Sequence, residues 1–388
     1  MFGFLIFIHE FGHYITARLC KVEINEFSIG MGPKIFGFRS KKTGILYALR
    51  ILPIGGYVSM EGENGNVEGI SSEKAPEIKA DENVEISDDG ENENDETVVF
   101  TEQAIQYRQT CAPFNKKNVW QRILITVAGG VTNIVIGAII MIAYIATSPA
   151  IGGTVVAEFA DSAVSNTQGL MELDEIVSVD GTKVDASTYL LYEISQTQGK
   201  PCEIVVNRGK YVYNEDKTKI ITKDDFETLT LEVSFGQETE QGVVMGVADF
   251  TVFRVQKTFS TVMRQSWSHT VLAGKMVWES IIGLITGRYG LQAMSGPIGT
   301  GEVIGQAASY GISQFLYLVA LISVNLGIAN LLPIPALDGG RLTFQVVEIV
   351  RRKPVPENIE GKIHTVGLLV LMALMIVIAM KDTIGLFK

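Results

Sequence analysis

Two of the four histidines in this chain lie four residues apart, in the segment His9-Glu10-Phe11-Gly12-His13. On a helix, side chains at positions i and i+4 share one face, so both imidazoles can reach the same metal ion. Glu10 lies on the adjoining turn, where its carboxylate can hold a water molecule bound to the metal. The segment therefore predicts a metal-dependent hydrolytic centre.

A catalytic zinc ion normally takes three protein ligands and a water molecule, so a third ligand is needed. Glu23 and Glu26 follow the helix too closely to fold back easily, and His364 flanks a loop. His269 falls in a segment that the predicted topology places across the membrane. Asp338, in an otherwise apolar stretch, is the favoured third ligand, with Glu23, Glu26 and His364 as weaker alternatives.

The segment around Asp338 reads NLLPIPALDGG over residues 330–340. Its two prolines and two glycines interrupt a helix and free backbone polar groups, which lipid cannot satisfy. Such groups must face protein or a water-filled cavity. A hydrolase that works within a membrane needs a cavity of this kind, because water and an unwound peptide must both reach the metal.

The composition indicates that apolar and acidic stretches are kept apart, since 47% of the 388 residues are hydrophobic and the net charge is −11. No nucleic-acid partner is expected, because such binding needs a basic surface. The three cysteines, Cys20, Cys111 and Cys202, form no CxxC pair. Neither a disulfide framework nor a cysteine-based zinc site is therefore predicted.

Four apolar stretches predict a polytopic helical membrane protein: residues 1–20, 123–147, 315–332 and 366–380. The second carries no charge and exceeds the roughly 20 residues that span a bilayer. The first is a poor signal peptide, since two histidines and a glutamate lie in its core and no small-residue cleavage site follows. Ionisable groups in such a span are costly and usually functional.

Lysine and arginine clusters orient the spans, because short cytoplasmic loops are enriched in both residues. Basic residues follow the first span, precede the second and separate the third from the fourth. One topology satisfies all three clusters: residues 21–121 are cytoplasmic, residues 150–314 lie outside, and both termini lie outside.

Two regions differ in character between the first two spans. Residues 44–60 read GILYALRILPIGGYVSM, a β-rich apolar run broken by Pro53, Gly55 and Gly56, which predicts a hairpin. From residue 61 to about residue 97 the chain is rich in Glu, Asp, Asn and Gly and cannot bury enough apolar surface to order itself. A flexible acidic cytoplasmic insert is predicted rather than a calcium site, because the EF-hand spacing is missing.

Residues 151–249 predict a separate outer α+β domain of short β-runs, with a helix at 186–197. Within it, GLMELDEIVSVDG resembles the PDZ family's stretch G-L-x-x-G-D-x-I-x-x-V-N-G, with Leu173-Asp174 in place of Gly-Asp and a turn at Asp180-Gly181. The resemblance implies a peptide ligand that adds a strand to a sheet edge. Residues 253–287 then predict one or two amphipathic helices, either at the membrane interface or packed against this domain.

HEFGH in the first span, PIGGYV after it and NLLPIPALDGG in a late span together resemble the site-2 protease family of intramembrane zinc metalloproteases. The single PDZ-like domain resembles the bacterial regulator-cleaving branch, and the resemblance covers nearly the whole chain apart from the acidic insert. By position it implies one Zn2+ per chain on His9, His13 and Asp338, with Glu10 as general base. Asn330 would hold the substrate backbone or polarise its carbonyl. A membrane-associated β-edge for the substrate is implied within residues 46–60, at Leu52, Pro53, Ile54, Gly55, Gly56 and Tyr57.

Two features depart from this family's pattern. Only Met1–Ile8 precede His9, so the first span is expected to be truncated or shortened by a misplaced start. AGGVTN at residues 128–133 replaces the usual A-G-P-x-x-N, and glycine at 130 in place of proline is expected to alter that bend. By contrast, the GPIG at residues 296–299 matches a recurrent stretch of the family.

The expected activity is zinc-dependent cleavage of transmembrane segments in the bacterial cytoplasmic membrane, with the active site towards the cytoplasm and the PDZ-like domain outside. The substrates would be single-pass membrane proteins in the lipid bilayer, above all an anti-sigma factor after a first cut. The same site could instead clear remnant signal peptides or release peptide pheromones. A non-catalytic, membrane-tethered PDZ scaffold is an alternative of another class, which the intact HExxH, Asn330 and Asp338 disfavour.

These elements divide the chain into six parts. Residues 1–60 hold the first span with its HExxH and the β region, 61–117 the acidic insert and linker, and 118–149 the second span. Residues 150–250 are expected to form the PDZ-like domain, 251–314 the amphipathic helices and a connector, and 315–388 the third and fourth spans.

Overall fold

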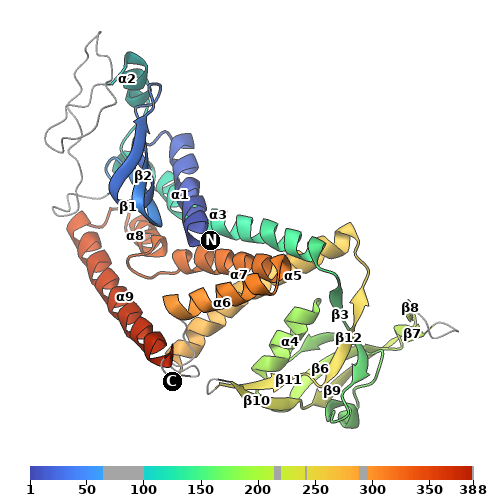
Figure 1. Ribbon diagram of the computed structural model, residues 1–388. Coiled ribbons are helices and arrows are strands. Elements are labelled where there is room, and N and C mark those ends of the chain that lie inside the picture. Colours follow the sequence, from blue (N-terminus) through green and yellow to red (C-terminus); the bar gives the residue numbers. More distant parts are fainter. Residues whose placement is uncertain (64–99, 214–219, 241–242, 288–295, 387–388) are drawn as a thin grey trace. The chain divides into compact units, whose positions relative to one another are not determined.

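The computed structural model describes residues 1–63, 100–213, 220–240, 243–287 and 296–386 (Figure 1). The chain divides into two compact units, one of residues 1–135 and 326–374 and the other of residues 136–325 and 375–388. Three helices contribute to both units: α3 (Val119–Thr147), α7 (Ile312–Leu331) and α9 (Glu357–Leu386). Within the described ranges, these are also the helices long and apolar enough to cross a membrane.

Three of the four predicted spans therefore coincide with helices of spanning length, as expected of a membrane protein. α1 (Phe2–Leu19) is helical as predicted, but its 18 residues include His9, Glu10, His13 and Arg18, and it is not among the three. The predicted fourth span is the middle of α9, which is much longer than 15 residues. The number of spans stays a prediction.

In the first unit, β1 (Ile24–Arg39) and β2 (Leu46–Met60) form a sheet that packs against α1 (Figure 1). Both strands bend at glycines with positive φ, at Gly30 and Gly32 in β1 and at Gly55 in β2. Because of these bends, residues 26–29 pair both with 46–49 and with 56–59, while 46–49 also pair with 36–39. Among the described strands, residues 56–59 have no other partner than 26–29, so they form an edge of this sheet.

The predicted hairpin exists, but it is built from two long strands and not from residues 44–60 alone. Residues 46–60 form the single strand β2, and the partner strand β1 was not predicted. The sequence of β1, INEFSIGMGPKIFGFR, mixes apolar residues with three glycines and a proline and shows no regular alternation. Pairing and packing on Tyr14 and Ala17 of α1, through Phe27 and Val58, hold it extended.

The acidic insert lies outside the described residues from 64 to 99, so its predicted flexibility stays a prediction. The linker that follows is folded, because α2 (Glu102–Gln109) begins with a cap in which Thr101 Oγ1 accepts the N–H of Ala104. Arg108 at the end of α2 forms an ion pair of 2.5 Å with Glu23. The linker that was expected to follow the insert is thus an ordered segment, because tertiary contacts hold it where its composition gives no signal.

In the second unit, five strands form one sheet in the order β12-β3-β4-β6-β9 (Figure 1). They are β3 (Ile151–Phe159), β4 (Glu175–Val179), β6 (Cys202–Arg208), β9 (Glu227–Val233) and β12 (Phe250–Val255). The sixth, β5 (Thr182–Lys183), pairs with β4. Two small pairs join β7 (Tyr211–Tyr213) to β8 (Ile220–Thr222) and β10 (Gly236–Glu240) to β11 (Val243–Val247).

The predicted short strands of this domain are confirmed, and so is the predicted helix, α4 (Ser187–Gln196). Leu190 and Ile194 of α4 are fully buried in a core shared with the sheet. The sheet ends at Val255, beyond the predicted boundary at residue 250, because β12 returns to pair with β3.

The stretch that resembles the PDZ family takes the backbone shape its usual glycines would favour. Leu173 has a φ of +70°, a conformation that L residues other than glycine adopt at a steric cost. Asp180 and Gly181 have φ values of +45° and +74° and form the two-residue turn between β4 and β5. The predicted turn at Asp180-Gly181 is confirmed.

Asp174 and Arg208 form an ion pair in this part of the domain. The carboxylate of Asp174, whose residue is 1% exposed, accepts bonds from Arg208 Nε at 2.9 Å and Arg208 Nη2 at 2.7 Å. It also accepts the N–H of Met171 at 2.9 Å. A buried carboxylate left without its cation is strongly destabilising, so the start of β4, which Asp174 directly precedes, and the end of β6 at Arg208 both depend on the pair.

α5 (Phe259–Ile285) is a single helix that packs against this domain, as one of the two alternatives predicted. Ser268 Oγ donates to Asp185 Oδ1 at 2.5 Å, and Lys275 pairs with Glu193 at 2.5 Å. Trp267 and Trp278 of α5 remain exposed, so a membrane-interface role for that face stays a prediction.

α6 (Pro297–Ser309) begins at the GPIG stretch singled out in the sequence. The carboxylate of Asp382 in α9 accepts the N–H groups of Gly296 and Gly299, at 2.9 and 3.1 Å. An acidic group is favourable at this end of a helix, so Asp382 caps α6.

Replacing Arg208 by alanine should leave the Asp174 carboxylate buried and uncompensated, and lower local stability by about 3 kcal/mol. Amides of β4 and β6 in the full chain should then exchange hydrogen roughly a hundredfold faster by mass spectrometry. The matched control is Arg254→Ala, which removes an exposed arginine from β12 of the same sheet. Equal exchange in the two variants would contradict the importance of the pair.

Candidate metal centre

The three residues predicted to bind metal converge in the first unit. Nε2 of His9 and Nε2 of His13 lie 3.2 Å apart, on one face of α1. Oδ2 of Asp338 lies 3.0 Å from Nε2 of His9 and 3.1 Å from Nε2 of His13. Both histidines are only 8% exposed. In the described part of the chain, this is the group of side chains with metal-ligating spacing.

The geometry of these donors fits zinc. A tetrahedral Zn2+ ion with bonds of about 2.0–2.1 Å separates its ligand atoms by about 3.3 Å. The three separations here, 3.0, 3.1 and 3.2 Å, are close to that edge length. Two imidazoles and a carboxylate are also a donor set that zinc accepts, with a fourth position left for water.

The surroundings of His13 leave Nε2 available for metal. Nδ1–H of His13 donates to the carbonyl oxygen of Ile125 in α3 at 2.8 Å. A neutral imidazole that carries its proton on Nδ1 has a bare lone pair on Nε2. A metal-binding histidine is commonly oriented by such a bond from its other ring nitrogen.

The other ring nitrogen of His9 faces two asparagine side chains. The amide nitrogens of Asn133 in α3 and Asn330 in α7 each lie 3.4 Å from Nδ1 of His9. Turning one amide by 180° presents its oxygen to Nδ1–H, which is the orientation that zinc binding through Nε2 requires. The predicted site residue Asn330 therefore lies beside the metal centre, and Asn133, fully buried, joins it.

Glycines let α3 approach the metal ligands. A methyl group on Gly129 would overlap Nε2 of His13 and lie 2.7 Å from Cε1 of His9. A methyl group on Gly12 of α1 would lie 2.7 Å from the carbonyl oxygen of Ala128. The two helices therefore cross at backbone contact, with the histidines in the space that Gly129 leaves open.

Gly130, which stands where the family usually has proline, makes a second close crossing. A methyl group there would lie 2.8 Å from the carbonyl oxygen of Gly327 in α7. α3 runs unbroken through this position. Glycine at 130 thus serves the contact between α3 and α7.

Asp338 is delivered by a break between two helices, as the prolines and glycines predict. α7 ends at Leu331, and α8 (Asp338–Arg351) begins with Asp338 itself. A methyl group on Gly339 would overlap the carbonyl oxygen of Leu332, and one on Gly340 would lie 2.7 Å from that of Ile334. Both glycines are needed because the loop folds back on its own first residues.

The edge of β2 passes beside Glu10. A methyl group on Gly56 would lie 3.3 Å from Cγ of Glu10 and 2.9 Å from the carbonyl oxygen of Ser28. Gly56 belongs to the edge segment 56–59 and to the predicted substrate-binding set Leu52, Pro53, Ile54, Gly55, Gly56 and Tyr57. The structure thus brings the predicted general base and the predicted substrate edge together.

A polar cluster holds this end of β2. Arg50 Nη2 donates to Tyr57 Oη at 2.6 Å and to Glu26 Oε1 at 2.7 Å. Burial raises the pKa of Tyr57 above its usual range, and bonding to Glu26 raises it further. Tyr57 therefore stays neutral and serves the β-structure instead of proton transfer.

The side chains of the other residues weighed as metal ligands are engaged in other contacts. Glu23 pairs with Arg108, and Glu26 pairs with Arg50. Nδ1 of His364 accepts the N–H of Ala336 at 3.0 Å. His269, in the second unit, packs against the rings of Tyr144 and Tyr317.

Sequence reasoning missed an ion pair next to the centre. Arg341, one turn after Asp338 on α8, pairs with Glu63, which follows β2. A lone arginine one turn after a metal-ligating aspartate is a signal that could have suggested a buried partner, but the partner lies 278 positions away. Asn133 appeared only as part of the AGGVTN stretch.

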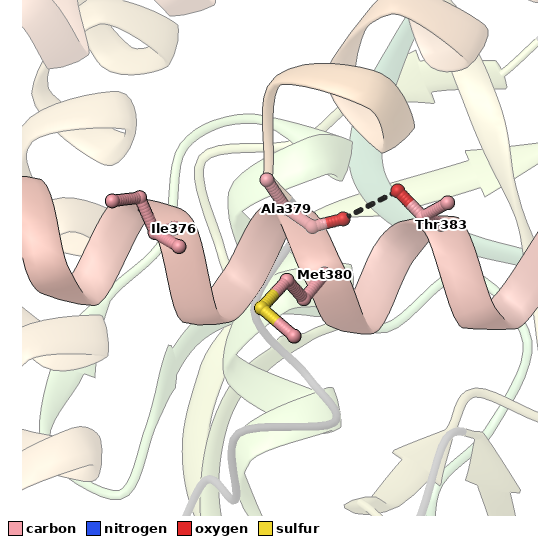
Figure 2. Close-up of a pocket in the computed structure, with 4 residues that line it drawn as sticks. All are labelled: Ile376, Ala379, Met380 and Thr383. Atoms are coloured by element: carbon pink, nitrogen blue, oxygen red, sulfur yellow. Dashed lines mark hydrogen bonds between the residues drawn. The ribbon is translucent and has the colours of Figure 1, made fainter.

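A recess on α9 carries no chemistry of this kind. Figure 2 shows its lining residues Ile376, Ala379, Met380 and Thr383, which share one helix face. The Thr383 hydroxyl is used within the helix, since it donates to the carbonyl of Ala379 at 2.8 Å. No titratable residue lines the recess.

Comparison with known proteins adds to this geometry. The profile of peptidase family M50 matches residues 1–374. The regulator of sigma-W protease RasP of Bacillus subtilis is 29% identical over 100% of this chain and 97% of its own length. The zinc metalloprotease RasP of Geobacillus kaustophilus is 30% identical over 98% of this chain and 96% of its own. A putative zinc metalloprotease of Clostridium perfringens is 30% identical over 99% and 96%.

Replacing Gly129 by alanine should weaken zinc binding about 10- to 100-fold, because the added methyl group displaces both imidazoles. In a free helix the same change would be favourable by about 1 kcal/mol. Zinc affinity is measured by competition with a chromogenic chelator in detergent. The control is Val131→Ala, an exposed position on the same helix. Zinc affinity equal to wild type in Gly129→Ala would refute the close approach.

Proposed function

We propose, because the chain belongs to peptidase family M50, the site-2 protease family, that it cleaves transmembrane segments of single-pass membrane proteins in regulated intramembrane proteolysis. The chain is a zinc metalloendopeptidase of the site-2 protease type. The alternative of a non-catalytic scaffold is thereby set aside. The observation that carries the proposal is the edge of β2 at Gly56, which passes against Glu10 beside the three metal ligands.

His9, His13 and Asp338 would hold the zinc ion. When bound, zinc polarises a water molecule and the scissile carbonyl. Glu10 would take the proton from that water and pass it to the leaving amine. The amide of Asn330 would donate to the carbonyl oxygen as negative charge develops there.

The β-edge would supply what an unwound substrate needs. A transmembrane helix satisfies its backbone groups internally and loses those bonds when it is extended for cleavage. Residues 56–59 offer an edge with which an extended segment can pair. A substrate paired there would present its backbone next to Glu10, since Gly56 has no side chain to intervene.

The same arrangement and the names of the relatives support the proposed substrate class. The Bacillus subtilis relative bears the name regulator of sigma-W protease. By analogy, we propose that this chain cleaves a membrane-bound anti-sigma factor after another protease has made a first cut. Clearance of remnant signal peptides or release of pheromones would use the same site and is the second candidate.

The β-rich domain of residues 151–255 is proposed to be PDZ-like and extracytoplasmic. β12 pairs only with β3 among the described strands, so it offers an edge for a peptide ligand. The Lys/Arg pattern supports this orientation, with the metal centre towards the cytoplasm of the bacterial cytoplasmic membrane. The domain would exclude substrates whose outer parts are still intact.

Replacing Glu10 by glutamine should abolish cleavage while zinc is retained, because Glu10 moves protons and is not a ligand. Membrane peptides are compared quantitatively in cells that carry wild-type or Glu10→Gln protein at equal level. Truncated single-pass proteins should accumulate with the variant, an anti-sigma factor among them. Accumulation of signal peptides alone would favour the second candidate, and identical peptide profiles would refute the activity.

Replacing Asn330 by alanine should lower kcat by about 10²- to 10³-fold with little change in KM, because its amide acts on the developing charge. Zinc affinity should stay close to wild type, since Asn133 still faces His9. Asn325→Ala on the same helix is the control, with unchanged kcat expected. A loss of zinc that matches the loss of kcat would instead make Asn330 a support for His9.

A further inference from the structure

We infer that His364 of α9 is a positioning residue for the metal centre: it holds the loop that aims the Asp338 carboxylate at zinc. The inference rests on the zinc site and not on the substrate class. His364 is separated from Asp338 by 26 positions in sequence, and the two lie in the same unit. The contact between them runs through Ala336.

The first observation is a hydrogen bond from a strained backbone position. Ala336 has a φ of +75°, a left-handed conformation that costs a residue with a Cβ atom free energy. Its N–H donates to Nδ1 of His364 at 3.0 Å. The turn bonds inside the loop use other groups: the N–H of Ile334 donates to the carbonyl oxygen of Leu332, and the N–H of Leu337 donates to that of Ile334. The imidazole therefore satisfies the N–H at the point where the loop is strained.

The second observation is how closely α9 packs on this loop. Gly367, three residues after His364 and on the same helix face, leaves room for Pro335: a methyl group there would lie 3.0 Å from the carbonyl oxygen of Pro335. A methyl group on Gly340 would lie 3.1 Å from Cε1 of His364. The ring of His364 thus sits between Ala336, before Asp338, and Gly340, after it.

The third observation indicates that His364 acts through its hydrogen bond and not only through the packing of its ring. Nε2 of His364 is buried and has no hydrogen-bond partner among the described residues. An unsatisfied buried polar atom lowers stability, so an apolar ring would fill the space beside Phe344 at a smaller cost. What the imidazole adds over an apolar ring is the acceptor Nδ1.

Only Leu337 separates Ala336 from Asp338, so the conformation of Ala336 affects the position of the Asp338 carboxylate. Asp338 is the first residue of α8, two residues after Ala336, and Leu337 at the N-cap makes no side-chain capping bond. The direction of the Asp338 carboxylate is therefore set by the backbone of the loop. Removing a group that orients a metal ligand commonly weakens metal binding by about 10- to 100-fold.

The test compares His364→Phe, which keeps a ring but removes the acceptor, with His364→Asn, whose amide oxygen can replace Nδ1. His364→Phe should lower zinc affinity about 10- to 100-fold, measured by chelator competition. It should lower kcat with KM unchanged. It should also speed hydrogen exchange at the Ala336 amide in the metal-free full chain. His364→Asn should retain most of all three properties.

A second substitution tests the strain directly. Ala336→Gly removes the steric cost of the positive φ, so the double variant Ala336→Gly, His364→Phe should recover about tenfold of the lost zinc affinity. This arm, with His364→Asn, keeps the test decisive if His364→Phe alone does not fold. Val366→Phe introduces the same ring at an exposed position of α9 and is the matched control.

Three outcomes would overturn the inference. Wild-type zinc affinity in His364→Phe would show that the bond is not needed. Equal losses in His364→Asn and His364→Phe, without recovery by Ala336→Gly, would show that only ring packing matters. Unchanged exchange at Ala336 would show that its N–H does not depend on His364. Because zinc binding and exchange need no substrate, these results stand apart from any failure of the proposed function.

Discussion

The structure depends on bringing three donor atoms to within about 3.3 Å of one another, the spacing that tetrahedral zinc requires. Two donors come from α1 at the start of the chain and the third from the start of α8, with 325 positions between His13 and Asp338. Side chains of ordinary size would keep helix axes some 8–10 Å apart. Glycines at the crossings remove that limit: Gly129 faces both imidazoles, and Gly130 meets Gly327.

The same requirement explains the loop before Asp338. A continuous α7 would carry residue 338 far along its axis, because a helix rises 1.5 Å per residue. The prolines stop α7 at Leu331, and Gly339 and Gly340 allow the chain to fold back so that α8 starts with its carboxylate at the zinc site. This path requires a positive φ at Ala336, and the acceptor for the N–H of Ala336 comes from α9. The end of α7, the start of α8 and His364 of α9 thus all contribute to the position of the Asp338 carboxylate.

The β-structure places a free strand edge beside the candidate metal centre. β1 and β2 bend at glycines, and the bends leave residues 56–59 as an edge at Glu10. The packing of Tyr14 and Ala17 with Phe27 and Val58 ties this sheet to α1. One helix therefore carries two of the proposed metal ligands, the proposed general base and the surface that positions the β-edge. In the proposed mechanism, α1 would therefore support both the activation of water and the pairing of the substrate.

The sequence by itself determined the local chemistry: the i, i+4 spacing of His9 and His13, the helix break before Asp338 and the turn at Asp180-Gly181. Each of these depends on neighbouring residues, so periodicity and backbone preference suffice to predict it. Only the tertiary structure decided that Asp338, and not Glu23, Glu26 or His364, meets the two histidines. It also decided that residues 24–39 form a strand, that residues 102–109 form a helix, and that Asn133 and His364 contact His9 and the loop before Asp338, respectively. These features depend on partners distant in the chain, and no local pattern encodes which distant groups will meet.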